Sequence, residues 1–209
     1  MVTYSAGGNL TVKNASLSYL VQEVYGVRVF QITGEPGWFN SDRFDISAKA
    51  DSNANKEQMQ AMAQRLLADR FQLKLHRVTK DFTVYLLIVG SKGSKLKDAA
   101  DPGDPANSGI RLRGTGYLTG MAASTGQLAV ALSDMRLNGQ ALLDRPVLDR
   151  TGLKGVYDFG LRWAPDGVPD SDYPSIFTAV QEQLGLKLDQ QRASIEAIVI
   201  DSVSRPSAN

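Results

Sequence analysis

Two aspartates occupy equivalent places in this sequence, and carboxylates are side chains that donate and accept protons in catalysis. A shift of 113 positions along the chain places Asp45 on Asp158, with apolar residues on both sides of each. Two such carboxylates act as general acid and general base when they converge on one point. They have an ordinary structural role when each caps a turn or pairs with its neighbouring arginine, Arg43 or Arg162. The sequence leaves both interpretations open.

Other side chains that commonly carry chemistry are scarce. The chain has no cysteine and one histidine among 209 residues. The lack of cysteine excludes disulfides, thiolate zinc sites and cysteine nucleophiles, and one histidine is too few for a His-Glu-x-x-His metallopeptidase site. His76 lies beside Lys74 and Arg77 on the polar face of a predicted strand, and no serine is tied to it by spacing. We therefore predict a surface histidine and no catalytic residues.

Three kinds of motif come close to known sites without matching them. Arg150 separates Asp149 from Thr151, whereas the loop of aspartic proteases needs Asp-Thr-Gly without a break, so we expect a turn in which Asp149 pairs with Arg150. The glycine-rich runs at 90–95 and 114–120 lack the spacing of phosphate or dinucleotide loops. Two groups of aspartates lack the ligand spacing of a calcium loop: Asp98, Asp101 and Asp104, and Asp166, Asp170 and Asp172. We predict no cofactor and no metal site.

The elements that position these residues follow from hydrophobic periodicity. Four stretches have helical spacing and suitable caps: 17–24 before Gly26, Asn55 to about Arg70, 124–135, and the stretch that follows Pro174 and ends at Gly185. Alternating residues predict strands at 43–49, 73–76 and 157–163. Two continuously apolar runs, 82–89 and 195–200, are typical of central strands that are buried on both faces.

These elements repeat along the chain. The offset of 113 aligns three successive elements, and an offset of 111 aligns the first helices of the two halves. We predict an α+β fold of two duplicated units, each strand–helix–strand followed by helix–strand–strand, packed as one pseudo-symmetric body with mixed or antiparallel sheets. The first repeat covers 1–95, a linker 96–110 and the second repeat 111–209. Residues 1–100 carry 13 basic and 9 acidic side chains, and the remainder carries 10 and 13, so opposite charges favour docking of the halves.

Composition limits the partners. A formal net charge of +1 gives no basic face for nucleic acid, so we expect none to bind. The longest apolar run, 82–89, is far shorter than the roughly 20 residues that cross a bilayer. We expect no membrane insertion by this chain. Its first residues also lack the basic and apolar regions of a signal peptide.

Several segments taken together resemble a known family. They are WFNSDRFDISAKA (38–50), LLADRFQLKLH (66–76), PVLDRTGLKGVYDF (146–159) and QLGLKL (183–188). The chain is similar to a soil-associated bacterial family defined only as a domain of unknown function, sometimes appended to sensor-type metallopeptidases. The resemblance implies an exported protein, hence an extracytoplasmic location, periplasmic or secreted, and it supplies no catalytic residues. The order of elements in the first half is also similar to the small interaction modules of secretins and TonB-dependent receptors, by analogy alone.

We therefore predict an extracytoplasmic binding or protein-interaction module without catalytic activity, with an unknown protein partner or small ligand. A cleft at the pseudo-symmetry axis is where we expect a ligand to bind. The candidate contacts there are Trp38, Arg43, Asp45, Arg150, Asp158 and Arg162. The alternative is a carboxylate-dependent hydrolase or lyase with its site between the two repeats.

Overall fold

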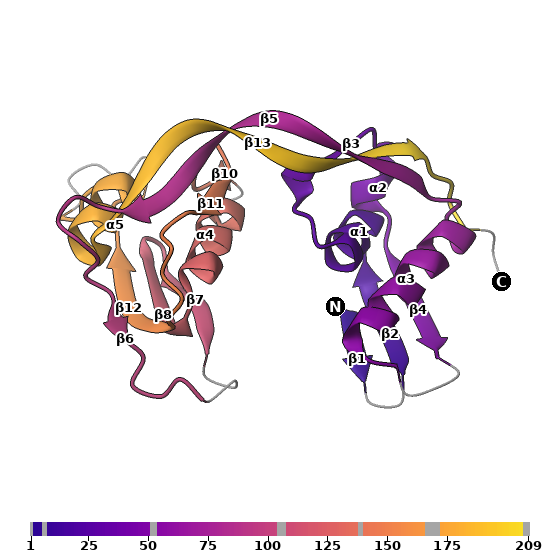
Figure 1. Cartoon of the computed structure of the whole chain (residues 1–209), viewed down its shortest axis with the longest axis horizontal. Helices are drawn as coiled ribbons and strands as arrows, with labels where there is room; N and C mark the ends of the chain where they lie inside the picture. Colours follow the sequence, from indigo (N-terminus) through magenta and orange to yellow (C-terminus); the bar gives the residue numbers. More distant parts are fainter. Residues whose placement is uncertain are drawn as a thin grey trace. The chain divides into compact units, whose positions relative to one another are not determined.

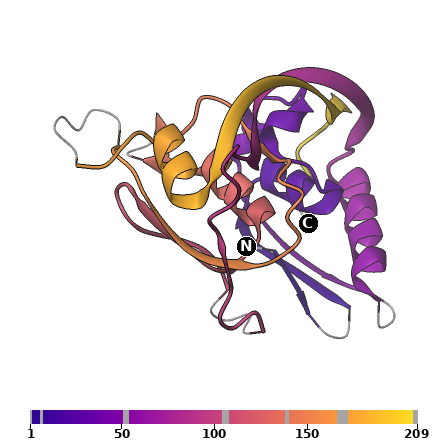
Figure 2. The ribbon, with the colours of Figure 1, turned by 60° about the vertical axis from the view of Figure 1, so that its left-hand side comes forward.

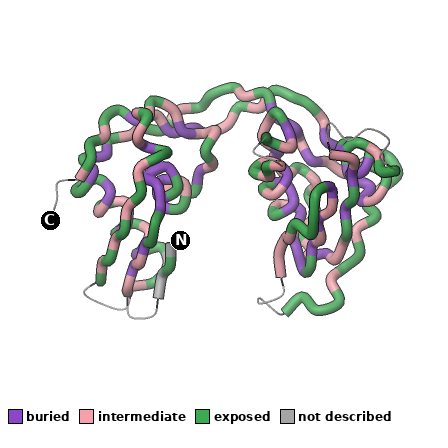
Figure 3. Tube along the Cα trace, turned by 180° about the vertical axis from the view of Figure 1, so that it is seen from behind, coloured by how far each residue is buried: buried purple, intermediate pink, exposed green. Residues whose placement is uncertain are grey.

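The computed structural model describes residues 2–5, 8–50, 54–103, 108–137, 140–165 and 172–206. The fold is α+β with antiparallel and mixed sheets, which confirms the predicted fold class. The chain divides into two compact units: unit 1 comprises Met1–Asp81 and Ser194–Asn209, and unit 2 comprises Phe82–Ala193. Each unit has its own buried core, visible as purple segments in Figure 3. None of the described helices is long and apolar enough to span a membrane.

Unit 1 is built on a three-stranded antiparallel sheet in the order β1-β2-β4 (Figure 1). Its strands are β1 (Val2–Ser5), β2 (Asn9–Ala15) and β4 (Phe44–Lys49). Two helices, α1 (Leu17–Tyr25) and α3 (Lys56–Arg70), contribute to the core with this sheet. Between α1 and β4 the chain forms a 3-10 turn (Val29–Gln31), β3 (Ile32–Thr33) and α2 (Trp38–Ser41).

Unit 2 contains a four-stranded antiparallel sheet in the order β6-β12-β8-β7. Its strands are β6 (Lys97–Asp98), β7 (Gly109–Gly114), β8 (Tyr117–Ala123) and β12 (Tyr157–Arg162). Helices α4 (Thr125–Asp134) and α5 (Ile176–Leu184) complete the unit with β9 (Arg136–Leu137), β10 (Gln140–Ala141) and β11 (Val147–Asp149).

Two long strands each begin in one unit and end in the other. They are β5 (Lys74–Val89) and β13 (Leu186–Ser202), and they run side by side in Figure 1 and Figure 2. Short parallel strands flank them, because β11 pairs with β5 in unit 2 and β3 pairs with β13 in unit 1. The predicted strands 73–76 and 82–89 therefore belong to one continuous strand. Polar residues at its centre, 79–81, are exposed and interrupt the hydrophobic pattern (Figure 3).

The four predicted helices are present and begin at side-chain caps. Ser16, Asn55, Ser124 and Ser175 accept a hydrogen bond from a backbone N–H in the first turn, which satisfies one of the N–H groups that a helix start leaves without a partner. The first helices of the two units therefore begin 108 positions apart, whereas sequence alignment alone suggested 111. The offset of 113 holds for β4 and β12.

The segment 96–110, predicted to be a linker, has contacts in unit 2. Strand β6 lies inside it and pairs with β12, and the N–H of Lys95 just before it donates to the carbonyl of Leu184 at 2.9 Å. Compact units and sequence repeats divide a chain by different criteria. The repeat boundaries therefore stay a prediction.

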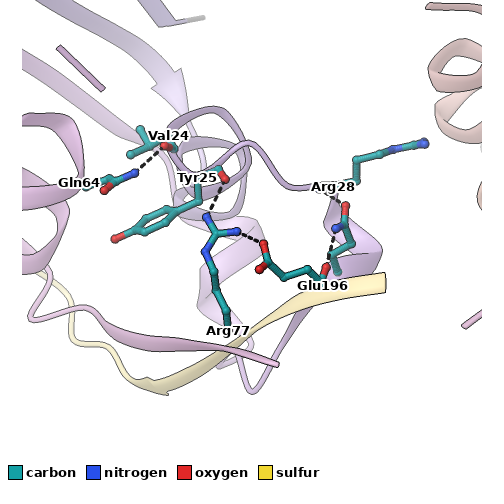
Figure 4. Close-up of polar contacts among 7 residues, drawn as sticks. Val24, Tyr25, Arg28, Gln64, Arg77 and Glu196 are labelled. Atoms are coloured by element: carbon teal, nitrogen blue, oxygen red, sulfur yellow. Dashed lines mark hydrogen bonds and ion pairs between the residues drawn. The ribbon is translucent and has the colours of Figure 1, made fainter. Parts of the chain in front are cut away.

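In unit 1, polar side chains bind the C-terminal end of α1 to its neighbours (Figure 4). The Gln64 amide of α3 donates to the carbonyl of Val24 at 3.1 Å, and Arg77 of β5 donates to the carbonyl of Tyr25 at 3.2 Å. Arg77 also forms an ion pair with Glu196 of β13. These contacts satisfy carbonyl groups that a helix end leaves without partners. The first helix is thus attached both to α3 and to the two long strands.

Candidate functional site

The two equivalent aspartates stabilise irregular positions in their sheets. The N–H of Asn14 donates to Asp45 Oδ1 at 2.7 Å, and the N–H of Ala122 donates to Asp158 Oδ1 at 2.8 Å. Asn14 and Ala122 have positive φ angles of 49° and 42°, and the pairing register shifts beside each of them. A non-glycine residue rarely adopts this backbone conformation without support. Each carboxylate therefore has the capping role that was one of its two predicted interpretations.

Asp158 accepts a second backbone hydrogen bond. The N–H of Ala100, just after β6, donates to Asp158 Oδ2 at 2.9 Å. The N–H groups of Ala100 and Ala122 hold the pKa of the Asp158 carboxyl below its ordinary value of 3.8, because they stabilise the charged form. No described residue donates to Oδ2 of Asp45.

We expect Asp158→Asn to lower the free energy of unfolding near neutral pH. An asparagine retains one acceptor oxygen, so one of the two N–H contacts is lost. A depressed folded-state pKa gives stability that is present above about pH 4 and is lost as the pH falls through the folded-state value. Urea unfolding at about pH 6 and about pH 2.5 should therefore show a difference between variant and wild type that shrinks in acid.

Asp45→Asn is the matched control for this prediction. Asp45 accepts one N–H from the described part of the chain, and an amide oxygen can still accept it, so the loss should be smaller than that of Asp158→Asn. A destabilisation by Asp158→Asn that does not change with pH would contradict the electrostatic role of the Asp158 carboxylate.

The other predicted contact residues pack against aromatic rings or lie in solvent. The ring of Trp38 lies 6.4 Å from that of Phe44. The guanidinium of Arg205 lies 5.1 Å from the centre of the Trp38 ring, over its face. Arg162 stacks on Tyr117 at 3.7 Å. Arg43 and Arg150 are exposed. The described contacts of Trp38 and Arg162 thus lie within their own units.

Asp149 does not have the partner that we expected. Its carboxylate accepts from the Thr125 hydroxyl at 2.7 Å and from the Thr151 hydroxyl at 2.8 Å, and the N–H of Thr151 donates to it at 2.9 Å. Among the described residues no ion pair joins it to Arg150, so the predicted Asp149–Arg150 pairing is wrong. Thr125 can reach the Asp149 carboxylate because it is the first residue of α4, which packs against β11. The carboxylate thus attaches the start of the helix to the strand.

His76 forms an exposed pair with Asp201, at 2.9 Å from Nδ1 to Oδ1. Among the described residues no group of three or more histidine, aspartate or glutamate side chains is placed to hold a metal ion. Three aspartates of the two predicted clusters, Asp104, Asp166 and Asp170, lie outside the described residues.

Unit 1 has an apolar groove between its sheet and helix α3. Its volume is about 360 Å³. The groove is lined by small and flexible apolar side chains, which are Leu10, Ala48, Ala50, Met59, Met62, Ala63 and Leu66. Charged residues surround it, and these are Lys49, Arg65, Asp69 and Arg70. We call this feature the β4–α3 groove. An open apolar site with charged margins suits a ligand that is partly hydrophobic.

The groove is open because strand β4 carries small residues where its counterpart in unit 2 carries large ones. Ala48 pairs with Leu10 across its sheet, and Leu161 pairs with Leu118 at the equivalent place in unit 2. Leu161 is fully buried, so a large side chain occupies in unit 2 the position at which the groove opens in unit 1.

The next matched pair shows the same difference. The N–H of Ala50 donates to the carbonyl of Gly8 at 2.8 Å, and the N–H of Trp163 donates to that of Gly116 at 2.9 Å. Trp163 is only 1% exposed and belongs to the core of unit 2. Sequence reasoning missed the groove because small apolar residues carry no chemical signal. The alignment at an offset of 113 does carry the signal, because it places Ala48 on Leu161 and Ala50 on Trp163.

A second hollow of about 290 Å³ continues the groove along the edge of the sheet. Both hollows are lined by Ala48, Leu66 and Arg70, and the second reaches Phe44 and Pro206. Strand β4 is the edge strand of its sheet in the described topology. The concave surface therefore follows an open strand edge over the whole length of β4.

The chain matches, over residues 18–203, a family described as "Protein of unknown function (DUF3738)". No curated protein and no solved structure was found to match it. The match includes parts of both units, both aspartates and the groove residues from Ala48 onward, while Leu10 of the groove lies before it.

Proposed function

The chain belongs to the DUF3738 family, and from this premise we propose that it is a binding module without catalytic activity whose ligand site is the β4–α3 groove of unit 1. The observation that carries the proposal is the replacement of Leu161 and Trp163 by Ala48 and Ala50 at matched positions. Filling this space with apolar side chains would contribute to stability, since buried apolar area is favourable. An apolar site kept open in one unit is typical of a surface that a ligand covers.

The lining of the groove suits a binding role. Met59 and Met62 are flexible and polarizable, which lets a surface adapt to irregular apolar groups. Met62 is 43% exposed, so its side chain is accessible to a ligand in the groove. Lys49, Arg65 and Arg70 outnumber Asp69 around the groove, so its margin favours a ligand with negative charge.

We infer that the two units descend from one duplicated unit, and the matched contacts support this. Both units have a serine-capped first helix, an aspartate that caps a bulge, and a backbone hydrogen bond to a glycine from the residue that directly follows β4 or β12. Among the described residues, Ala48 and Ala50 leave the groove open in unit 1, whereas Leu161 and Trp163 are buried at the matched positions of unit 2. Duplication followed by divergence explains why one copy gives up packing for binding.

The carboxylate-dependent alternative has no support in this geometry. Asp45 and Asp158 both hold bulges through backbone hydrogen bonds, and this role accounts for their equivalent places. An extracytoplasmic location, periplasmic or secreted, remains our proposal. Its support is the resemblance to exported bacterial proteins.

Binding of the anionic apolar dye 1-anilinonaphthalene-8-sulfonate tests the groove. We expect a fluorescence increase with the wild-type chain and an affinity at least about fivefold lower with Ala48→Leu, a loss of about 1 kcal/mol, because the added side chain fills the space. Met62→Gln removes apolar lining at an exposed position and should also weaken binding.

Ala61→Leu is the matched control, since Ala61 is exposed on the same helix and does not line the groove. It should leave dye binding unchanged. Circular dichroism of each variant verifies folding. Equal dye affinity in Ala48→Leu, Met62→Gln and wild type would overturn the proposed site.

A further inference from the structure

Unit 2 shows what can cover the edge that β4 leaves open. Strand β6 pairs antiparallel with β12, with Lys97 opposite Asp158 and Asp98 opposite Tyr157. The N–H of Ala99 donates to the carbonyl of Val156 at 3.0 Å. The shift of 113 places Tyr157 and Asp158 on the first two residues of β4. In unit 2 the chain thus adds a strand of its own at the place where β4 is an edge.

The backbone of β4 has donors available on this edge. The N–H of Ala50 bonds inward to Gly8, and Ala48 lies opposite Leu10 in the same ladder. Inward and outward groups alternate along an antiparallel strand. The N–H groups of Asp45, Ser47 and Lys49 therefore point outward, and none of them pairs with a described residue.

Asp45 differs from Asp158 in the hydrogen bonds that its two carboxylate oxygens accept. In unit 2, Asp158 uses Oδ1 for the bulge and Oδ2 for the N–H of Ala100, which follows the added strand. Asp45 uses Oδ1 for the bulge, and no described residue donates to its Oδ2. Asp45 Oδ2 can thus accept a hydrogen bond from the backbone of an incoming strand.

We propose that the β4–α3 groove binds an extended peptide, which adds to β4 as an antiparallel strand and places alternate apolar side chains in the groove. Ile46 and Ala48 are half-buried while Asp45, Ser47 and Lys49 are exposed, so every second side chain of a paired peptide lies on the same face as the groove. Main-chain hydrogen bonds provide affinity in this mode of recognition, and pockets for alternate side chains provide specificity.

Charge defines the peptide further. The margin of the groove carries Lys49, Arg65 and Arg70 against Asp69. Acidic side chains near the apolar positions of the peptide complement this excess of positive charge. The partner is thus an acidic, apolar segment in extended conformation, belonging to another protein. This inference rests on the proposed function, because it names the ligand of the same groove.

The probe is a displayed library of random linear heptapeptides, selected on the whole chain and counter-selected on Ala48→Leu. We expect the enriched peptides to alternate apolar with acidic residues and to lack proline in the alternating stretch. The strongest peptide should slow hydrogen exchange at the amides of Asp45, Ser47 and Lys49. Amides of Ile46 and Ala48, which face β2, should change less.

Ser47→Pro separates this inference from the proposed function. Proline is tolerated in an edge strand where its missing N–H faced solvent, so the variant should retain the sheet and the groove. We expect a loss of peptide affinity of at least about tenfold, with unchanged dye binding. The same peptide with N-methylated amides on alternate residues provides a second measurement that needs no variant.

Peptides that bind with helical spacing, peptides that bind equally well when N-methylated, or a failure to enrich any peptide while dye binding persists would overturn strand addition and leave the groove as a site. Loss of both dye and peptide binding in the wild-type chain would overturn the proposed function as well.

Discussion

Trp163→Ala is expected to lower the free energy of unfolding of unit 2 by about 3–5 kcal/mol, the largest effect of any change considered for this chain. Trp163 is 1% exposed and lies in the core cluster of unit 2, which includes Leu118, Leu161 and Ile176. Removing the indole leaves a cavity, because the strand backbone is attached to Gly116 and cannot move in to fill it.

Two spectroscopic signals separate the units in this experiment. The chain has two tryptophans, so Trp38 of unit 1 is the only one left in Trp163→Ala. Tryptophan fluorescence then follows the unfolding of unit 1, while circular dichroism follows both units. We expect a transition at lower urea concentration in circular dichroism, and little change in the fluorescence of Trp38.

Trp163→Phe provides the control. Phenylalanine keeps most of the apolar volume, and the indole Nε1 has no acceptor among the described residues, so its removal also relieves an unsatisfied polar group. The loss should be less than half of that caused by alanine. An unchanged urea midpoint for Trp163→Ala would show that the position is not part of the core.

Local sequence signals were sufficient for the helices. The helix that begins after Asn55 is marked by Gln58 three residues later, and the two side chains form the reciprocal capping box of the structure. The signal lies within four neighbouring residues and depends little on the rest of the chain. The same reasoning located the start at Ser124, whereas Pro174 and Gly185 marked the limits of the last helix.

The long strands were harder to predict, because their central residues carry no hydrophobic alternation. Residues 79–81 of β5 and 190–192 of β13 are exposed, and periodicity depends on burial of one face. The shift of 113 found Asp45 and Asp158, but their role depends on the positive φ angles of Asn14 and Ala122. No local sequence motif predicts such a bulge.

The groove was missed in the sequence for a different reason. It consists of volume that side chains do not fill, and alanine at 48 or 50 is an unremarkable residue in an isolated strand. Only comparison with Leu161 and Trp163 gives those alanines a meaning. The same comparison of matched positions predicts which pairs of facing side chains can replace one another in the two sheets.

Gly120→Val is expected to destabilise unit 2 by about 1–3 kcal/mol, and Phe159→Ile is expected to rescue it. Gly120 lies opposite Phe159, and a Cβ at Gly120 would meet the Phe159 ring far inside van der Waals contact. At the matched position of unit 1, Val12 lies opposite Ile46. The total volume of the pair is thus divided differently in the two units.

A double-mutant cycle measures this complementarity. Valine has a higher strand propensity than glycine, so the single variant loses stability only because the ring blocks it. Urea unfolding of Gly120→Val, Phe159→Ile and the double variant should give a favourable coupling free energy of about 0.5–3 kcal/mol, since the double variant recreates the pair found in unit 1. Val12→Ala is a control in unit 1 and should be additive with both changes. Additive losses for the pair itself would mean that the two positions are not equivalent, and would remove one support of the inferred duplication.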